Sequence, residues 1–421
     1  VSPSLKADQR ALTVEPNALA STTPSLMGQL SEIGRGLNLT ATPDPGQVFS
    51  NWTGSVTSSA PILNTLMESN FVLRANFIPN PFLAVKGAYN GLFLESTNPV
   101  SHQRAGFVTA TVTDHGSFSG KLLIDGGTHP ISGKFGLDGA FQQSVARAGK
   151  STLNVQLQLG LGASAGRITG TIGASGWQAV LEADRSVFHP ATNPASLYRG
   201  SFGLVFPSGP PDPARPGGHG FATIQIDAGG STRLLGSLGD GTAVVQMVAL
   251  GVTGRWPFYT ALYGLKGSAL GWIQLTNAGA GLEPGGPVTW TKTAVSGKLY
   301  PSGFTNHVDL LGSSFIAPAK GIRVLDVTNA IFSVVGGNYV PATNATLTIN
   351  TNNSVTITST NLPGLSVTLS AVSALSSGNF IHPATRHPAP FKGILLQNRR
   401  QGFGWFTGTN ATGAVTLETA P

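Results

Sequence analysis

Apolar and polar residues alternate along much of this chain, which is the spacing of a strand with one buried face. The clearest cases, where β-branched residues are also frequent, are 107–113, 153–159, 345–349 and 354–358. Turn signals rich in Gly and Asp lie between them, for example at 125–127 and 239–241. Strand-length segments separated by turns at about every ten residues are typical of barrels and sandwiches. The pattern predicts an all-β protein.

The chain also repeats itself at a spacing of 133 residues. When 257–277 is laid over 390–410 without gaps, seven of the 21 positions agree, including Gly271-Trp272 with Gly404-Trp405. A weaker sequence similarity relates the residues that begin three predicted hairpins, at 89–93, 198–202 and 391–395. Internal repetition of this kind predicts two or three related antiparallel units after about residue 85.

We therefore predict four parts. A small β domain with an extended N-terminal stretch is expected at 1–80, followed by β units at 81–190, 191–293 and 294–421. The last unit is related to the one before it by the 133-residue shift. The predicted fold class is all-β: a small β-repeat domain followed by two or three antiparallel β-barrel or sandwich units.

The first part carries a specific order of residues. A strand at 37–42 runs into the turn Pro43-Asp44-Pro45-Gly46, then a strand bearing Phe49 and Trp52, and a closing strand at 71–77. This order resembles the divergent internalin-B-type repeat over residues 10–78. The resemblance implies a small β domain of a bacterial surface protein that serves as a spacer or an interaction module.

The body of the chain resembles a second known region. The residues that carry this likeness lie at 80–82, 85–93, 116–122, 183–185, 256–259, 393–397 and 402–406. Together they are similar to the β-rich C-terminal region of large secreted proteins of environmental bacteria, which commonly follows an internalin-B-type repeat. The resemblance implies location and architecture, but no activity, cofactor or catalytic residue.

Composition narrows the class further. Of 421 residues, 55 are Gly, none is Cys, and only 25 Lys and Arg plus 18 Asp and Glu are charged. The 40% hydrophobic content excludes a disordered chain, and the absence of Cys excludes disulfides and thiolate metal sites. The net charge of +7 is spread thinly, with Arg399-Arg400 as the one adjacent basic pair, so we expect no nucleic-acid partner.

Two observations bear on location. No run of 18 apolar residues occurs, so no transmembrane helix is expected. The absence of Cys and a first residue, Val1, that is not Met fit the mature form of an exported bacterial protein without its leader. We expect an extracellular or cell-surface location.

Two motifs imitate catalytic or cofactor sites. Residues 162–166 read Gly-Ala-Ser-Ala-Gly, the pattern of a nucleophile elbow, and 160–165 imitate a dinucleotide-binding loop. Both require a helix after a strand, whereas strand-like residues stand on both sides here. A hairpin turn is the better interpretation of both.

Few residues offer acid–base or metal chemistry. Glu182 and Asp184 share a strand face and are interpreted as a surface ion pair, with Arg185 beside them, rather than as a catalytic pair. His382 and His387 are the closest histidines and, like His129 and His189, precede Pro, which places them in turns or extended segments. We expect no catalytic, cofactor-binding or metal-binding residue.

The aromatic residues leave one functional question open. Exposed Trp rings can stack on sugars, and the chain has Trp52, Trp177, Trp256, Trp272, Trp290 and Trp405. Trp272 and Trp405 recur beside a Gly, which we interpret as a core ring packed over a glycine. Trp256 is also expected in the core, and Trp177 stays undecided.

These observations favour a non-enzymatic, exported structural or adhesive protein that assembles with itself or with other surface proteins, as a filament or surface-layer subunit. The low number of charged residues favours contacts between strands of different chains, because charged side chains on edge strands usually prevent such contacts. The stretch from Val1 to Ala20 is expected to add a strand to a neighbour. The alternative is a carbohydrate-binding module that uses exposed tryptophans.

Overall fold

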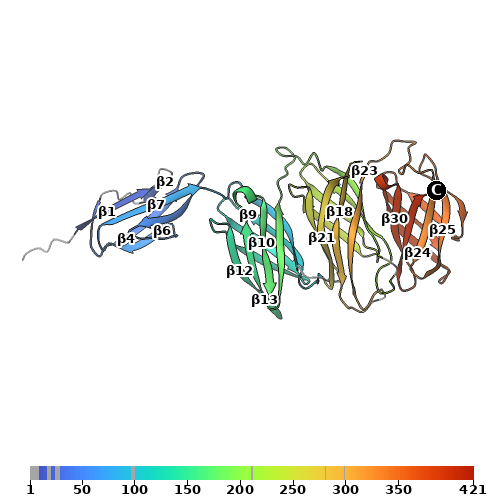
Figure 1. The fold of residues 1–421 in the computed structure, drawn as a ribbon, viewed down its shortest axis with the longest axis horizontal. Helices are drawn as coiled ribbons and strands as arrows, with labels where there is room; N and C mark the ends of the chain where they lie inside the picture. Colours follow the sequence, from blue (N-terminus) through green and yellow to red (C-terminus); the bar gives the residue numbers. More distant parts are fainter. Residues whose placement is uncertain are drawn as a thin grey trace, which may run out of the picture.

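The computed structural model describes residues 9–16, 20–23, 29–95, 100–209, 212–279, 281–297 and 299–421. These residues form an N-terminal domain and three larger sheets that follow one another in a row (Figure 1). The described residues contain strands and two short 3-10 turns but no α-helix. The predicted all-β class with barrel-like antiparallel units is confirmed.

The N-terminal domain packs two small sheets over one apolar core. One sheet has the order β3 (Gln29–Glu32), β1 (Gln9–Pro16), β7 (Phe71–Pro79), β5 (Gln47–Gly54). The other has the order β2 (Ala20–Thr23), β4 (Gly36–Pro43), β6 (Ile62–Leu66). Trp52, Leu39 and Leu73 are fully buried between them.

The described strands of the N-terminal stretch are paired within the chain. In β1, Gln9–Leu12 pair antiparallel with β3 and Leu12–Pro16 pair parallel with β7. Strand β2 pairs with β4. The donor-strand prediction is therefore wrong for 9–16, because the domain uses that strand to complete its own sheet. Residues 1–8 and 17–19 lie outside the described residues.

Barrel 1 is an eight-stranded antiparallel sheet that curls until it is nearly closed. Its strands are β8 (Gly87–Glu95), β9 (Gly106–Val112), β10 (Ser117–Ile124), β11 (Gly127–Lys134), β12 (Ala140–Arg147), β13 (Lys150–Leu159), β14 (Arg167–Ala174) and β15 (Trp177–Arg185). First strand β8 pairs with last strand β15, and β11 and β12 are the two edges. Large inward side chains such as Tyr89, Phe93 and Phe118 fill the interior.

Barrel 2 repeats this order of strands. Its strands are β16 (Gly200–Phe206), β17 (Gly220–Ile226), β18 (Ser231–Ser237), β19 (Ala243–Ala249), β20 (Arg255–Leu262), β21 (Gly267–Asn277), β22 (Leu282–Lys292) and β23 (Phe304–Phe315). Again the first strand pairs with the last, and the fourth and fifth strands are the edges. Trp256, Phe258 and Trp290 fill the interior.

Barrel 3 places its edges one strand earlier. Its strands are β24 (Asn329–Gly336), β25 (Tyr339–Ile349), β26 (Val355–Thr360), β27 (Ser366–Leu369), β28 (Leu375–Ile381), β29 (Pro388–Leu396), β30 (Gln401–Thr407) and β31 (Thr412–Thr419). First strand β24 pairs with last strand β31, but the edges are the third and fourth strands. Phe380, Phe391 and Phe406 lie in its core.

The sheets do not follow the predicted boundary at 293/294. Strand β23 lies beyond that boundary, but it pairs with β22 and β16 of barrel 2. Gly297, Pro301 and Gly303 give the connection before β23 the composition of a linker, although it joins two paired strands. The division of the chain into independent folding units stays a prediction.

Candidate functional site

The false catalytic motifs lie in a turn between paired strands. Strands β13 and β14 are antiparallel neighbours, and residues 162–164 form the single 3-10 turn η1 (Gly162–Ser164) between them. No helix follows either motif, so Ser164 is not held on an elbow and no helix N-terminus is available for a phosphate. The hairpin interpretation holds for both.

The histidines singled out from the sequence do not gather into a site. The buried His382 ring places Nε2 3.0 Å from the Gly337 carbonyl oxygen, and the backbone N–H of His382 donates to the His387 carbonyl over 3.0 Å. His129 lies on β11, and His189 forms an isolated bridge with Asn193. No group of three or more His, Asp or Glu side chains with metal-ligand spacing occurs in the described parts of the chain.

The two acids of β15 face the neighbouring barrel instead of forming a surface pair. Arg255 of β20 donates from Nε to Asp184 Oδ2 over 2.5 Å, and from the same guanidinium to Glu182 Oε2 over 3.0 Å. Asp184 is 4% exposed, and Arg167 lies 3.5 Å from its other oxygen. Arg185 turns away and donates to the Ala84 carbonyl. The surface-pair prediction is wrong, because its cation comes from the next barrel.

These residues belong to junction 1, the contact of β8, β9 and β15 of barrel 1 with β20 and β21 of barrel 2. The Arg255 guanidinium also lies 4.1 Å from the centre of the Trp272 ring. Phe107 stacks on Tyr259 with ring centres 5.8 Å apart, and Leu92 and Leu270 are buried beside them. A buried ion pair and stacked rings hold the two barrels together.

A buried histidine completes junction 1. His102 lies between β8 and β9, is 2% exposed, and places Nδ1 2.9 Å from Ser268 Oγ and Nε2 3.2 Å from the Leu265 carbonyl. Burial lowers the pKa of His102, so the ring is neutral near pH 7 and donates from Nε2 to that carbonyl.

Junction 2 joins β16, β17 and β23 of barrel 2 to β29 and β30 of barrel 3. Trp405 of β30 donates from Nε1 to Ser237 Oγ over 2.7 Å. A Cβ atom on Gly241 would lie 2.8 Å from this ring, so glycine leaves room for it. The half-buried His219 accepts at Nδ1 from the Ser208 N–H over 3.0 Å, and its ring meets the edge of Phe403. Burial lowers the pKa of His219 to about 4.

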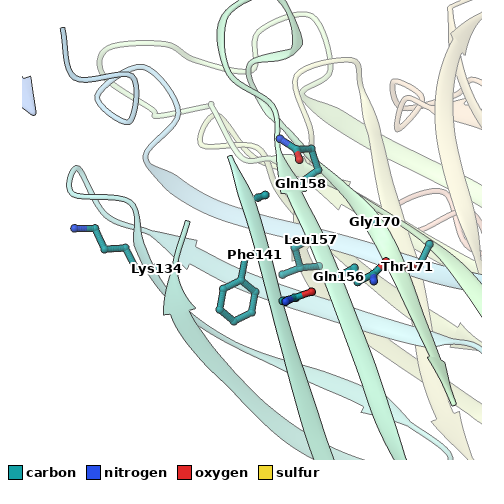
Figure 2. Close-up of a pocket in the computed structure, with 9 residues that line it drawn as sticks. Lys134, Phe141, Gln156, Leu157, Gln158, Gly170 and Thr171 are labelled. Carbon is teal, nitrogen blue, oxygen red and sulfur yellow. Dashed lines mark hydrogen bonds between the residues drawn. The ribbon is translucent and has the colours of Figure 1, made fainter. Parts of the chain in front are cut away.

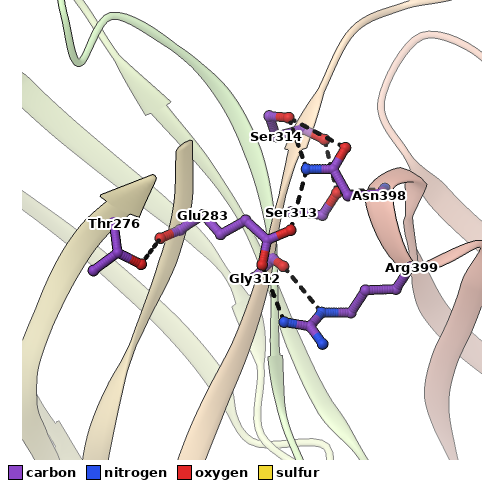
Figure 3. Close-up of polar contacts among 7 residues, drawn as sticks. All are labelled: Thr276, Glu283, Gly312, Ser313, Ser314, Asn398 and Arg399. Carbon is purple, nitrogen blue, oxygen red and sulfur yellow. Dashed lines mark hydrogen bonds and ion pairs between the residues drawn. The ribbon is translucent and has the colours of Figure 1, made fainter. Parts of the chain in front are cut away.

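A second group of polar contacts borders junction 2 (Figure 3). Glu283 of β22 accepts from Asn398 over 3.2 Å and from Arg399 over 3.0 Å. The Asn398 N–H donates to Ser313 Oγ over 3.0 Å, and Arg399 Nε donates to the Gly312 carbonyl over 3.3 Å. Residues 397–399 form the 3-10 turn η2 (Gln397–Arg399), which carries both side chains toward barrel 2.

Both junctions use the same two sides of a barrel. The leading barrel contributes chiefly its first, second and last strands, with Ser237 at the end of the third strand of barrel 2, and the following barrel contributes strands from its second half. The 133-residue repeat matches β20 and β21 to β29 and β30, the strands that receive the preceding barrel. These are the fifth and sixth strands of barrel 2 but the sixth and seventh of barrel 3. The repeat therefore follows the receiving face and not the strand number.

The repeated tryptophans lie at these junctions and not in the cores. Trp272 and Trp405 are half-buried and face outward, while Gly271 and Gly404 are buried and face inward. The core prediction fails because successive residues of a strand point to opposite faces, so a Gly cannot seat the ring next to it in sequence. Gly241 of the other barrel provides that seat for Trp405.

None of the six tryptophans is available as an exposed sugar platform. Trp52, Trp256 and Trp290 are buried in cores, and Trp177, Trp272 and Trp405 are half-buried. The carbohydrate-binding alternative therefore finds no exposed tryptophan to support it. Trp256 is a core residue, as expected, and Trp177 packs at the rim of the barrel 1 core.

The side of barrel 1 that corresponds to a receiving face is uncovered. It is formed by β12, β13 and β14, with β12 on the side away from barrel 2 (Figure 1). Its outward residues form three cross-strand rows: Ala140, Gln158 and Thr169; Gln142, Gln156 and Thr171; Ser144, Asn154 and Gly173. We call this array the open face of barrel 1. Figure 2 shows a shallow hollow on it, lined by Gln156, Gln158 and Thr171.

The leading side of barrel 3 is likewise uncovered, at the other end of the row. Its first, second and last strands, β24, β25 and β31, present two full cross-strand rows outward: Thr346, Ile331 and Glu418; Asn344, Ser333 and Thr416. We call this array the open face of barrel 3. Two of its three strands, β24 and β25, belong to a segment, 327–385, whose 59 residues include no Asp, Glu, Lys or Arg. The absence of charged residues from this segment is visible in the sequence, but it matches no functional motif and so does not by itself indicate a contact surface.

The comparisons with known proteins agree with the N-terminal interpretation. Residues 10–81 match the model of the divergent InlB B-repeat domain. No curated protein matches the chain. Two solved structures of transferrin binding protein B align with most of it. The isotype 1 protein from serogroup B Neisseria meningitidis covers 92% of this chain and 84% of its own at 10% identity, with a TM-score of 0.21.

The second is a point mutant of the vaccine antigen from Haemophilus parasuis Hp5, which covers 91% of this chain and 85% of its own at 10% identity, with a TM-score of 0.19. In the described residues no helix is long and apolar enough to cross a membrane.

Proposed function

We propose that this chain is a non-enzymatic, surface-exposed bacterial protein of structural or adhesive type, in which an N-terminal repeat domain carries a row of barrels that associates with other copies of itself. The match of residues 10–81 to the divergent InlB B-repeat domain supports a surface location. Other surface proteins are the second class of partner. Exposed tryptophans play no part in the proposal.

One observation carries this proposal: the ionised and aromatic groups that offered chemistry are used to join barrels. Arg255, Asp184 and Glu182 bind one another across junction 1, and Glu283 and Arg399 do so across junction 2. A general acid or base must be able to reach a substrate, but Asp184 is buried under the guanidinium. The same groups give the row a fixed geometry, which a spacer or a filament subunit needs.

Electron microscopy of the purified protein, with sedimentation velocity over a range of concentrations, tests the proposal. We expect elongated particles that grow in length as concentration rises. Particles that stay single at every concentration would contradict the self-associating part. Compact particles, with the barrels gathered instead of aligned, would contradict the structural role as well.

A further inference from the structure

The two open faces occupy the positions that a further junction would use. Within the chain, the first, second and last strands of one barrel pack on second-half strands of the next, and this happens twice. Such a contact joins two different surfaces, so it leaves one of each kind unused at the ends of the row. A head-to-tail contact of this type closes into a ring or continues as a filament when it is repeated between chains.

The open faces are also matched in charge. The strands of the open face of barrel 1 carry three ionised residues, all cationic and all at strand ends: Arg147, Lys150, which pairs with Asp125, and Arg167, which lies 3.5 Å from Asp184 Oδ1. The strands of the open face of barrel 3 carry one, the anionic Glu418. Arg147 donates to Ser151 and has no acidic partner in the described parts of the chain, so it is the cation left for an anionic rim. Opposite signs at the rims favour contact of the two faces and oppose contact of either face with itself.

Between these rims both faces are uncharged and rich in amides and hydroxyls. Gln156 and Thr171 stand opposite each other in the middle of one face, and Ser333 and Asn344 in the middle of the other. Thr171 donates to Gln156 Oε1 over 3.3 Å, and the Gln156 side chain is exposed. Such groups suit a wet, reversible interface, unlike the apolar and ion-paired junctions inside the chain.

The N-terminal domain borders the open face of barrel 1 without lining it. The groove between that domain and barrel 1 has a volume of about 1230 Å³ and is lined by residues 40–41, 43–50, 59, 61–62, 80, 82–83, 114–115 and 134–138. None of those residues belongs to β12, β13 or β14. The domain therefore reaches barrel 1 at its loops, and the strand face beside them stays open.

We infer that the open face of barrel 3 of one chain docks on the open face of barrel 1 of a second chain, as a third, intermolecular junction that continues the row. This inference rests on the proposed self-association and names its interface. The partner is a second copy, because this chain itself carries a surface that repeats the leading side of a barrel with an anionic rim, the open face of barrel 3.

Two lysine substitutions test the assignment by sedimentation velocity on the full chain. Gln156→Lys places a cation in the middle of the barrel 1 face, and Ser333→Lys does the same for the barrel 3 face. Each is expected to weaken association by more than about tenfold, because the ammonium group must be desolvated in the contact. Ser119→Lys on β10 and Thr368→Lys on β27 are exposed, lie outside both faces, and should leave association unchanged.

Mixing the two variants gives the sharper result. The Gln156→Lys chain keeps an intact barrel 3 face, and the Ser333→Lys chain keeps an intact barrel 1 face, so an equimolar mixture should form dimers and nothing longer. Circular dichroism melting confirms that each variant is folded. Association of wild-type protein that neither lysine weakens would overturn this interface while leaving self-association in place.

Variants that lose association but form no dimers on mixing would also overturn the head-to-tail pairing. A wild-type chain that stays monomeric throughout would overturn both this inference and the self-associating part of the proposed function.

Discussion

The covered and open faces of these barrels have the same backbone but different side chains. On the covered faces, Arg255 reaches the buried Asp184 and Trp405 reaches the half-buried Ser237 of the neighbouring barrel. The rows of the open faces consist mainly of Gln, Asn, Ser and Thr. A permanent contact tolerates a buried ion pair and aromatic rings, while a surface that is exposed in the free chain must stay soluble. The difference separates surfaces used within one chain from those available to another.

The largest effect is expected when the covered face of barrel 2 loses its cation. Arg255→Ala leaves Asp184 buried with only the longer contact to Arg167, and loss of a buried ion-pair partner costs about 3 kcal/mol. Urea unfolding should show that decrease in the free energy of unfolding. Arg400→Ala, which removes a pair exposed on both sides, is the matched control and should cost less than about 1 kcal/mol. Equal losses in the two variants would show that junction 1 does not depend on its ion pair.

The second largest effect is expected at junction 2, which should become less stable in acid. The folded-state pKa of His219, about 4, lies below its unfolded value near 6.5, so the unfolded chain binds the extra proton first. The stability supplied by neutral His219 is present above pH 6.5 and is lost as pH falls toward 4. The loss should reach about 2 kcal/mol for this half-buried ring.

Unfolding measured between pH 7 and pH 4 checks this expectation. His219→Asn should flatten the pH dependence, whereas His307→Asn, at an exposed site on β23, should not. A profile that is the same with and without His219 would contradict the assigned role.

A smaller effect is expected from the hydrogen bond of Trp405. Trp405→Phe keeps a ring at junction 2 but removes the donor to Ser237 Oγ, at a cost of about 1 kcal/mol. Ser237→Ala should cost a similar amount, and the double variant should cost less than the sum of the two. Strict additivity in this cycle would show that the bond contributes nothing.

The smallest effect is expected on the open face of barrel 1. Gln142→Ala and Asn154→Ala remove exposed side chains and should change stability by less than about 0.5 kcal/mol. Thermal melting at low protein concentration, where chains are dissociated, makes this comparison. A decrease of more than about 1 kcal/mol in the free energy of unfolding would show that these side chains stabilise the barrel itself and are not simply a surface available to another chain.

Much of the fold could be predicted from local patterns. Alternation over 153–159 gives strand β13 directly, and the Gly and Asp turns at 125–127 and 239–241 fall between paired strands. The order of turn and aromatic residues at 43–52 was enough to identify the N-terminal domain. These signals are local, because a strand's period and a tight turn are set by residues adjacent in sequence.

The junctions could not be predicted because their partners are distant in sequence. Arg255 lies 71 positions from Asp184, and Trp405 lies 168 positions from Ser237. The 133-residue repeat falls on the receiving strands, but in the sequence alone it predicts only related units, and the Gly beside each Trp favours a core position for the ring. Knowing which face of a strand is covered requires the arrangement of neighbouring barrels, which no local pattern supplies.

Disulfide trapping tests the intermolecular junction most directly, because the natural chain has no Cys. A chain with both Gln156→Cys and Ser333→Cys, oxidised at a concentration where association occurs, should give a ladder of dimers, trimers and longer species on a denaturing gel. Each single variant should give none, because a head-to-tail contact brings position 156 against position 333 and never against itself. Equal products from the single and double variants would contradict the head-to-tail continuation of the row.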